Sequence, residues 1–223
     1  MIDKKKFWEK KIIQWENGRY GVEKQKNNVI ENLSDNLSSS LIYRQKFALD
    51  LLNNVKDKNL TILELGCGSG LIVNKIFNLG FKNYIGVDIS ENAISRAREM
   101  NKSFGHKAKF FSSNTNFLAD EKINVVFSLG LFDWLIDDEI RDIFNFYPES
   151  MHLHSISERK RSISQVLHKI YVHISYGYKS EGYKPKYHTL EDIKKLYISN
   201  ILSEIKIFNH KNLKFGAFVK NYD

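Results

Sequence analysis

Three glycines alternate with other residues in segment 64–70, which reads Glu-Leu-Gly-Cys-Gly-Ser-Gly. Glycine allows a tight turn and a close approach of backbone to ligand, and the free N–H groups of a following helix attract carboxylate and other anionic ends. A phosphate-binding P-loop would continue with Lys and Ser or Thr, whereas Leu71 and Ile72 follow here. A dinucleotide fingerprint requires Gly or Ala at position 71. The loop is therefore expected to bind some other ligand, or to be only a tight turn.

A single carboxylate, Asp88, ends the next predicted strand. It can accept both hydroxyl protons of a ribose at once, or it can simply begin a turn before Ser90. Together, segment 64–70 and Asp88 resemble the E/D-x-G-x-G-x-G loop and the ribose-binding acidic residue of class I S-adenosylmethionine-dependent methyltransferases. The resemblance is clear over residues 60–135 and looser in the last two predicted strands.

The resemblance implies S-adenosylmethionine as cofactor. In that family the loop wraps the methionine and ribose, a residue placed like Ile89 packs on the adenine, and the pair Ser113 and Asn114 lies near the adenine amino edge. Leu129 would face the sulfonium, and Cys67 is expected to be a small packing residue. The implied cofactor-binding residues are Glu64, Gly66, Cys67, Gly68, Ser69, Gly70, Asp88, Ile89, Ser113, Asn114 and Leu129.

Methyl transfer from a sulfonium is an in-line displacement, so the protein mainly aligns donor and acceptor and excludes water. A base is needed only for a poorly acidic acceptor. Asp133 follows a predicted strand and is a candidate base, or it caps the next turn. His154 is a second catalytic candidate. It shares a strand face with His152, but both fit packing roles equally, and no third ligand suggests a metal site.

A basic and aromatic stretch in the C-terminal half supplies the acceptor-site candidates. Arg159 and Arg161 suit bidentate binding of phosphate or carboxylate, or they belong to a solvated charge run. Tyr187 and His188 would complete an acceptor pocket, or they only fill a lid.

Strands and helices alternate along the chain, as in a parallel sheet covered on both faces. One or two helices come first, and the strands are predicted at 60–65, 84–87, 109–112, 123–129, 151–156, 204–208 and 215–220. The helices between them are predicted at 71–79, 90–103, 137–147, 164–175 and 189–199. We therefore expect an α/β, Rossmann-like, seven-stranded, mostly parallel sheet with helices on both faces and an antiparallel edge strand. It forms one domain over 1–223, with N-terminal helices in 1–56 and a lid-like insertion at 157–188.

The chain has 223 residues, a net charge of +8 and one cysteine. These values favour an anionic partner and a reducing, cytoplasmic setting, and no membrane segment or signal peptide is expected. The main hypothesis is O-methylation of a small anionic or carbohydrate-like metabolite. RNA methylation is the alternative, since basic and aromatic residues also suit phosphates and bases. A non-catalytic S-adenosylmethionine-binding protein is the third.

Overall fold

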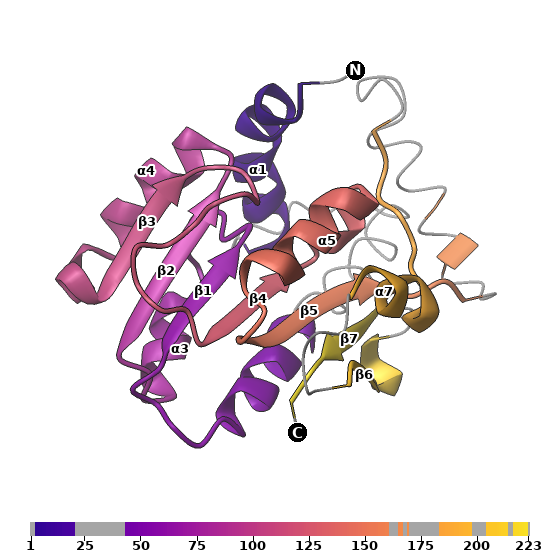
Figure 1. Ribbon diagram of the computed structural model, residues 1–223. Helices are drawn as coiled ribbons and strands as arrows, with labels where there is room; N and C mark the ends of the chain where they lie inside the picture. Colours follow the sequence, from indigo (N-terminus) through magenta and orange to yellow (C-terminus); the bar gives the residue numbers. More distant parts are fainter. Residues whose placement is uncertain are drawn as a thin grey trace.

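The chain alternates strands with helices around one seven-stranded sheet (Figure 1). The computed structural model describes residues 3–20, 43–160, 165–166, 169, 183–197, 204–213 and 216–222. The strands are β1 (Thr61–Leu65), β2 (Asn83–Asp88), β3 (Ala108–Ser112), β4 (Val125–Leu129), β5 (Met151–Ser157), β6 (Lys206–Asn209) and β7 (Gly216–Lys220). The longer helices are α1 (Lys4–Tyr20), one over 43–53, α3 (Val73–Asn78), α4 (Glu91–Met100), α5 (Asp137–Phe146) and α7 (Leu190–Leu196).

The strand order is β3-β2-β1-β4-β5-β7-β6. The five strands from β3 to β5 pair in parallel, and β7 pairs antiparallel with both β5 and β6. This confirms the expected Rossmann-like sheet and the closing hairpin at its edge. The antiparallel strand β7 lies one position inside that edge, because β6 takes the outermost place.

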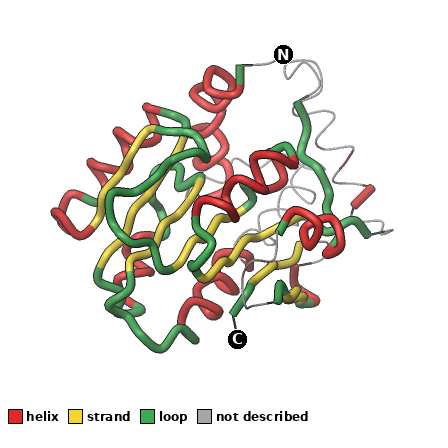
Figure 2. The backbone as a smooth tube through the Cα atoms, in the orientation of Figure 1, coloured by secondary structure: helices red, strands yellow, loops and turns green. Residues whose placement is uncertain are grey.

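Helices cover both faces of the sheet (Figure 2). The helix over 43–53, α3 and α4 pack on one face, where Leu52, Ile76 and Ile94 are buried. The α5 and α7 helices pack on the other face through side chains such as Ile140 and Ile193. The central strands are apolar in nearly every position because alternate side chains of each strand enter opposite layers.

The two helix starts that were predicted from capping residues, at Ser90 and Thr189, are confirmed. The hydroxyl of Ser90 accepts a hydrogen bond from the N–H of Ala93 at 3.1 Å, and Thr189 and Asp192 form a reciprocal capping box at 2.8 and 3.1 Å. Other boundaries differ by a few residues: α3 starts at Val73 rather than at 71, and α4 ends at Met100 rather than at 103. The helix predicted at 164–175 lies largely outside the described residues. None of the described helices is long and apolar enough to cross a bilayer.

Candidate functional site

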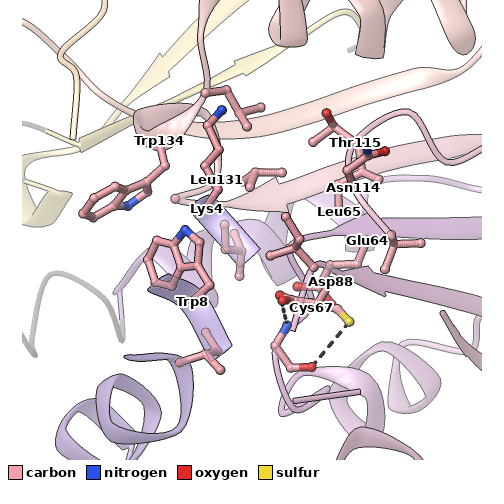
Figure 3. Close-up of a pocket in the computed structure, with 18 of the residues that line it drawn as sticks. Lys4, Trp8, Glu64, Leu65, Cys67, Asp88, Asn114, Thr115, Leu131 and Trp134 are labelled. Atoms are coloured by element: carbon pink, nitrogen blue, oxygen red, sulfur yellow. Dashed lines mark hydrogen bonds between the residues drawn. The ribbon is translucent and has the colours of Figure 1, made fainter. Parts of the chain in front are cut away.

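A pocket opens where the parallel strands β1, β2 and β4 end. In an open α/β sheet, ligands bind beyond these carboxyl ends, at the point where the strand order reverses. Asp88 and Cys67 lie on one side of the pocket, and Trp8 and Trp134 lie on the other (Figure 3). The pocket therefore has a polar end at the glycine loop and an aromatic end at Trp8 and Trp134.

Two glycines of the loop have backbone conformations that residues with a side chain rarely adopt. Gly66 and Gly68 have φ values of +72° and +53°, in the left-handed region that glycine adopts without strain. The N–H groups of Gly66 and Cys67 both donate to the carbonyl of Val87, at 2.7 and 3.0 Å, which ties the loop to the end of β2. A Cβ on Gly66 would lie 3.3 Å from Leu131, so the loop is also closely packed against the pocket wall.

Asp88 joins the glycine loop to the following helix. One carboxylate oxygen accepts the N–H of Gly68 and the other accepts that of Ser90, each at 2.9 Å. Burial raises the pKa of Asp88 to about 6, against the two backbone hydrogen bonds that lower it. Each oxygen keeps a second lone pair, so the carboxylate can still accept the two hydroxyls of a ribose.

Glu64 lies deep in the pocket, only 4% exposed. The hydroxyl of Tyr84 donates to its carboxylate, and burial raises the pKa of Glu64 to about 8. A cationic ligand group beside Glu64 would shift this pKa down and hold the carboxylate ionised. The carboxyl groups of Glu64 and Asp88 at this end fit a cofactor that carries an ammonium and a sulfonium, whose charge would favour the ionised form of Glu64.

Nine of the eleven cofactor-binding residues implied by the sequence line this one pocket: Glu64, Gly66, Cys67, Gly68, Asp88, Ile89, Ser113, Asn114 and Leu129. Cys67 is buried, and burial raises the pKa of its thiol well above the usual value, which agrees with a packing role. Ser69 and Gly70 do not line the pocket. Ser69 is fully buried and faces α1 instead.

One face of α1 covers the pocket, although no site residue was expected in this part of the chain. Lys4, Trp8, Ile12 and Glu16 line the pocket at intervals of four residues, which places them on one side of a helix. That spacing is the signal that could have revealed them. The helix is also joined to the start of α4. The carboxylate of Glu9 accepts the N–H groups of Glu91 and Asn92 at 2.9 and 2.8 Å.

Glu16 makes the deepest contact of α1. Its carboxylate accepts the backbone N–H of Ser69 at 2.7 Å and the hydroxyl of Ser69 at 2.5 Å. A Cβ added to Gly68 would collide with the same carboxylate. Glu16 is 5% exposed, and its charge contributes to the raised pKa of both Glu64 and Asp88.

The other end of the pocket is an aromatic chamber made by Trp8, Trp134 and Tyr183, with Phe7 packed behind them. The rings of Trp8 and Trp134 meet edge to face at 5.0 Å, and those of Trp134 and Tyr183 lie 5.1 Å apart. The Tyr183 hydroxyl donates to the carbonyl of Trp134 at 3.1 Å. Lys4 pairs with both oxygens of Glu139 at 2.6 Å on the rim. Three distant segments therefore build this chamber.

Asp133 does not line the pocket. Its carboxylate accepts the backbone N–H and the hydroxyl of Ser157, at 2.6 and 2.7 Å, and lies 3.6 Å from the guanidinium of Arg44. The side chain is 5% exposed. Its contacts tie the turn after β4 to the end of β5.

His154 is also outside the pocket and has no solvent exposure. Its Nδ1 lies 3.0 Å from the Ser128 hydroxyl and its Nε2 lies 3.1 Å from Nδ1 of His152, so the two histidines do share one strand face. The ring stacks on Phe132 at 4.1 Å. Burial lowers the pKa of both histidines, that of His152 to about 4. These contacts are those of a packed, neutral side chain.

The predicted acceptor residues gather elsewhere. Arg159, Tyr187 and His188 line a second hollow, which shares no lining residue with the first pocket. Arg161 lies outside the described residues. In the part of the chain that the structure describes, no three His, Cys, Asp or Glu side chains are grouped as metal ligands would be.

Two solved structures share this fold over 97% and 76% of the chain. The magnesium protoporphyrin IX methyltransferase of Synechocystis PCC 6803, solved with bound SAH, superposes with a TM-score of 0.70 over 97% of this chain and 96% of that one, at 15% identity. A SAM-dependent methyltransferase from Methanosarcina mazei gives a TM-score of 0.58 over 76% of this chain and 94% of that one, at 19% identity. At these identities the likeness shows the fold.

Curated relatives match in part. The ribosomal protein L11 methyltransferase of Chromobacterium violaceum is 31% identical over 71 residues, which are 32% of this chain and 24% of the relative. A putative protein N5-glutamine methyltransferase of Methanocaldococcus jannaschii is 34% identical over 98 residues, 43% of this chain and 50% of the relative. The matches thus span half or less of the length of these relatives.

A family model described as "Methyltransferase domain" matches residues 56–176, more than half of the chain. This segment contains the glycine loop, Asp88 and the ends of the five parallel strands. The chain therefore belongs to the methyltransferase domain family, of the class I, S-adenosylmethionine-dependent type that its cofactor loop resembles.

Proposed function

We propose that the protein binds S-adenosylmethionine in the pocket at the ends of β1, β2 and β4 and transfers its methyl group to an oxygen of a small anionic metabolite. The observation that carries this proposal is the continuity of the pocket. The glycine loop and Asp88 lie at one end, the aromatic chamber lies at the other, and α1 covers both.

The polar end suits the donor. Asp88 would accept the ribose hydroxyls, Glu64 would attract the ammonium, and Ile89, Ser113 and Asn114 would surround the adenine. Bound S-adenosylmethionine supplies an electrophilic methyl group. The residues of the chain hold the donor, orient it and exclude water, which are the main requirements of an in-line displacement.

The aromatic end suits a small acceptor. Trp8 belongs to α1 and Tyr183 to a distant segment, yet the indole N–H of Trp8 donates to the Tyr183 hydroxyl at 3.4 Å. This contact joins α1 to the segment that contains Tyr183, so both supply aromatic rings to one end of the pocket, where a small acceptor would pack. Lys4 on the rim pairs with Glu139, and it would hold an anionic group of the acceptor only by exchanging this partner.

The described pocket supports an acceptor that needs no strong base. Glu139 is engaged by Lys4 and by the N–H of Ile136 at 2.8 Å, and Asp133 and His154 lie outside the pocket. An oxygen that is already anionic requires only alignment with the methyl group. An acidic oxygen is therefore the favoured site of methylation.

Donor binding is tested by calorimetry with S-adenosylhomocysteine, the demethylated product, on Gly68→Ala and Asp88→Ala. Gly105→Ala is the matched control, because Gly105 has φ +55° but no atom within 4 Å of an added Cβ. We expect affinity to fall at least about tenfold in both variants and to stay unchanged in the control. Asp88→Ala removes charged hydrogen bonds, and Gly68→Ala places a Cβ against the Glu16 carboxylate at a positive φ. Normal binding by both pocket variants would refute the donor site.

The class of acceptor is tested by incubating the protein with a cell extract and S-adenosylmethionine that carries a radiolabelled methyl group. Dialysis then separates labelled small molecules from labelled RNA and protein. The proposal expects label in the dialysable fraction, and Trp134→Ala should reduce it while product binding persists. Label confined to retained RNA or protein would overturn the small-molecule assignment. Tight donor binding without transfer to either fraction would favour a non-catalytic role.

A further inference from the structure

A second hollow, of about 610 Å³, lies outside the first pocket. Four parts of the chain meet there: α5, the end of β5, the segment 186–188 and α7, with Lys169 beside them. Its charged side chains are Arg141, Arg159, Lys169, Lys186, Lys195, Asp137 and Asp192. Asp138, which lies outside this lining, pairs with Arg141, so carboxylates pair with three of the five cations.

These carboxylates compensate only part of the positive charge of the hollow. Asp192 lies 3.7 Å from Arg159, and Asp137 lies 3.3 Å from Lys186. Among the described residues, neither Lys169 nor Lys195 pairs with a carboxylate. A concave surface with excess positive charge attracts anions more strongly than an open one.

Backbone contacts hold Arg159 in place. Its N–H donates to the carbonyl of His188 at 2.9 Å, and its guanidinium donates to that of Tyr187 at 3.1 Å. His188 is 4% exposed, and its Nε2 lies 3.1 Å from the carbonyl of Phe132. These hydrogen bonds restrict the position of the Arg159 guanidinium before any ligand binds, which reduces the entropy lost on binding.

Tyr187 adds an aromatic ring to this cationic site. The ammonium of Lys169 lies 5.3 Å from the centre of the Tyr187 ring, so the ring contacts one of the cations. A planar guanidinium and several ammonium groups form a donor set that fits phosphate oxygens.

We propose that this hollow binds a phosphate or diphosphate group of the methyl acceptor. The same two segments line both sites: Tyr183 and Trp134 line the first pocket, and Lys186 and Asp137 line the hollow. Three residues of chain span at most roughly 10 Å, so one small molecule can reach from one site to the other. The assignment to the acceptor rests on the proposed function; the anion site itself does not.

The test is titration of the full chain with inorganic pyrophosphate, followed by NMR or calorimetry without cofactor. Arg159→Ala/Lys195→Ala removes two cations from the hollow. Its matched control, Lys160→Ala/Lys194→Ala, removes two cations from the neighbouring positions, which pair with Glu158 at 2.7 Å and Glu204 at 3.1 Å outside it. We expect at least about tenfold weaker binding in the first variant, from the loss of charged hydrogen bonds, and little change in the control.

Equal losses in the two double variants would show a general charge effect and overturn the site, as would no binding by the wild-type protein at millimolar pyrophosphate. A single-stranded RNA that binds much more tightly, and loses this binding only in Arg159→Ala/Lys195→Ala, would overturn the assignment to a small acceptor. Unchanged thermal unfolding and S-adenosylhomocysteine affinity in both variants exclude folding damage. If the wild-type protein did not bind S-adenosylhomocysteine, the donor site would be refuted, but the pyrophosphate result would still hold.

Discussion

The carboxylate of Glu16 accepts hydrogen bonds from both the backbone N–H and the hydroxyl of Ser69, at 2.7 and 2.5 Å. This relationship joins the N-terminal helix α1 directly to the glycine loop. Because the same helix covers the pocket, a ligand that enters or leaves must displace α1 or pass beside it. The two hydrogen bonds between Glu16 and Ser69 should therefore affect the rate at which the cofactor dissociates.

Glu16→Ala should release S-adenosylhomocysteine about tenfold faster. Hydrogen bonds to a charged group contribute about 1.5–3 kcal/mol each, and their loss lets α1 leave the loop more readily. Stopped-flow tryptophan fluorescence measures the rate, since Trp8 and Trp134 line the pocket. Lys10→Ala on the exposed part of the same helix should leave the rate unchanged. An unaltered rate in Glu16→Ala would show that α1 does not control exchange.

Binding of S-adenosylmethionine should release roughly one proton at pH 7, mainly from Glu64. The pKa of Glu64 is about 8 and that of Asp88 is about 6, so Glu64 is mostly protonated and Asp88 mostly ionised before binding. A bound cation favours the ionised form, and affinity should rise from pH 6 to pH 8. Calorimetry in HEPES and in Tris measures the proton, because these buffers differ in ionisation enthalpy. Identical enthalpies in the two buffers would contradict the prediction.

The same carboxylates should set the pH dependence of stability in the ligand-free protein. Both folded pKa values lie above the unfolded values of about 4, so their stabilising contribution is complete below pH 4 and is lost as pH rises through 6 and then 8. Glu64→Gln keeps an oxygen that can accept from Tyr84 but removes one titration. Urea unfolding of this variant should therefore show a flatter decline between pH 7 and pH 9 than the wild-type protein does.

The donor half of the site was predictable because its signals are local. The glycine loop and Asp88 end adjacent strands of one β-α-β unit, and the backbone conformation of Gly68 excludes most other residue types there. A short sequence therefore carries the position, the conformation and the chemistry together.

The aromatic end of the pocket, the proposed acceptor site, depends on contacts between residues far apart in the sequence. Trp8 and Tyr183 are 175 positions apart, yet they meet above Trp134. Periodicity can predict that α1 is a helix, but it does not say which surface the helix covers. The alternation of His152 and His154 correctly placed them on one strand face, but it did not reveal that this face is the core.

His154→Gln should change acid stability far more than methyl transfer. The two buried histidines have pKa values below that of an unfolded histidine, so the unfolded chain binds protons first as pH falls from about 6.5 to 4. This linkage removes on the order of 3 kcal/mol of stability for a shift of the size seen for His152. Urea unfolding at several pH values should show a smaller acid loss in the variant. A collapse of kcat with normal stability would instead make His154 a catalytic base.

Asp133→Ala should lower the free energy of unfolding by about 3–5 kcal/mol, the usual cost of removing one partner from a buried ion pair. The change strands the guanidinium of Arg44 and the N–H and hydroxyl of Ser157, which Asp133 now accepts at 2.6 and 2.7 Å. The matched control is Asp138→Ala, because Asp138 pairs with Arg141 on the exposed surface and such pairs contribute within about 1 kcal/mol. Chemical denaturation measures both, and S-adenosylhomocysteine affinity below the transition should persist. Unchanged stability with loss of methyl transfer would overturn the structural role and assign Asp133 to the chemistry, which would require the turn after β4 to move toward the pocket.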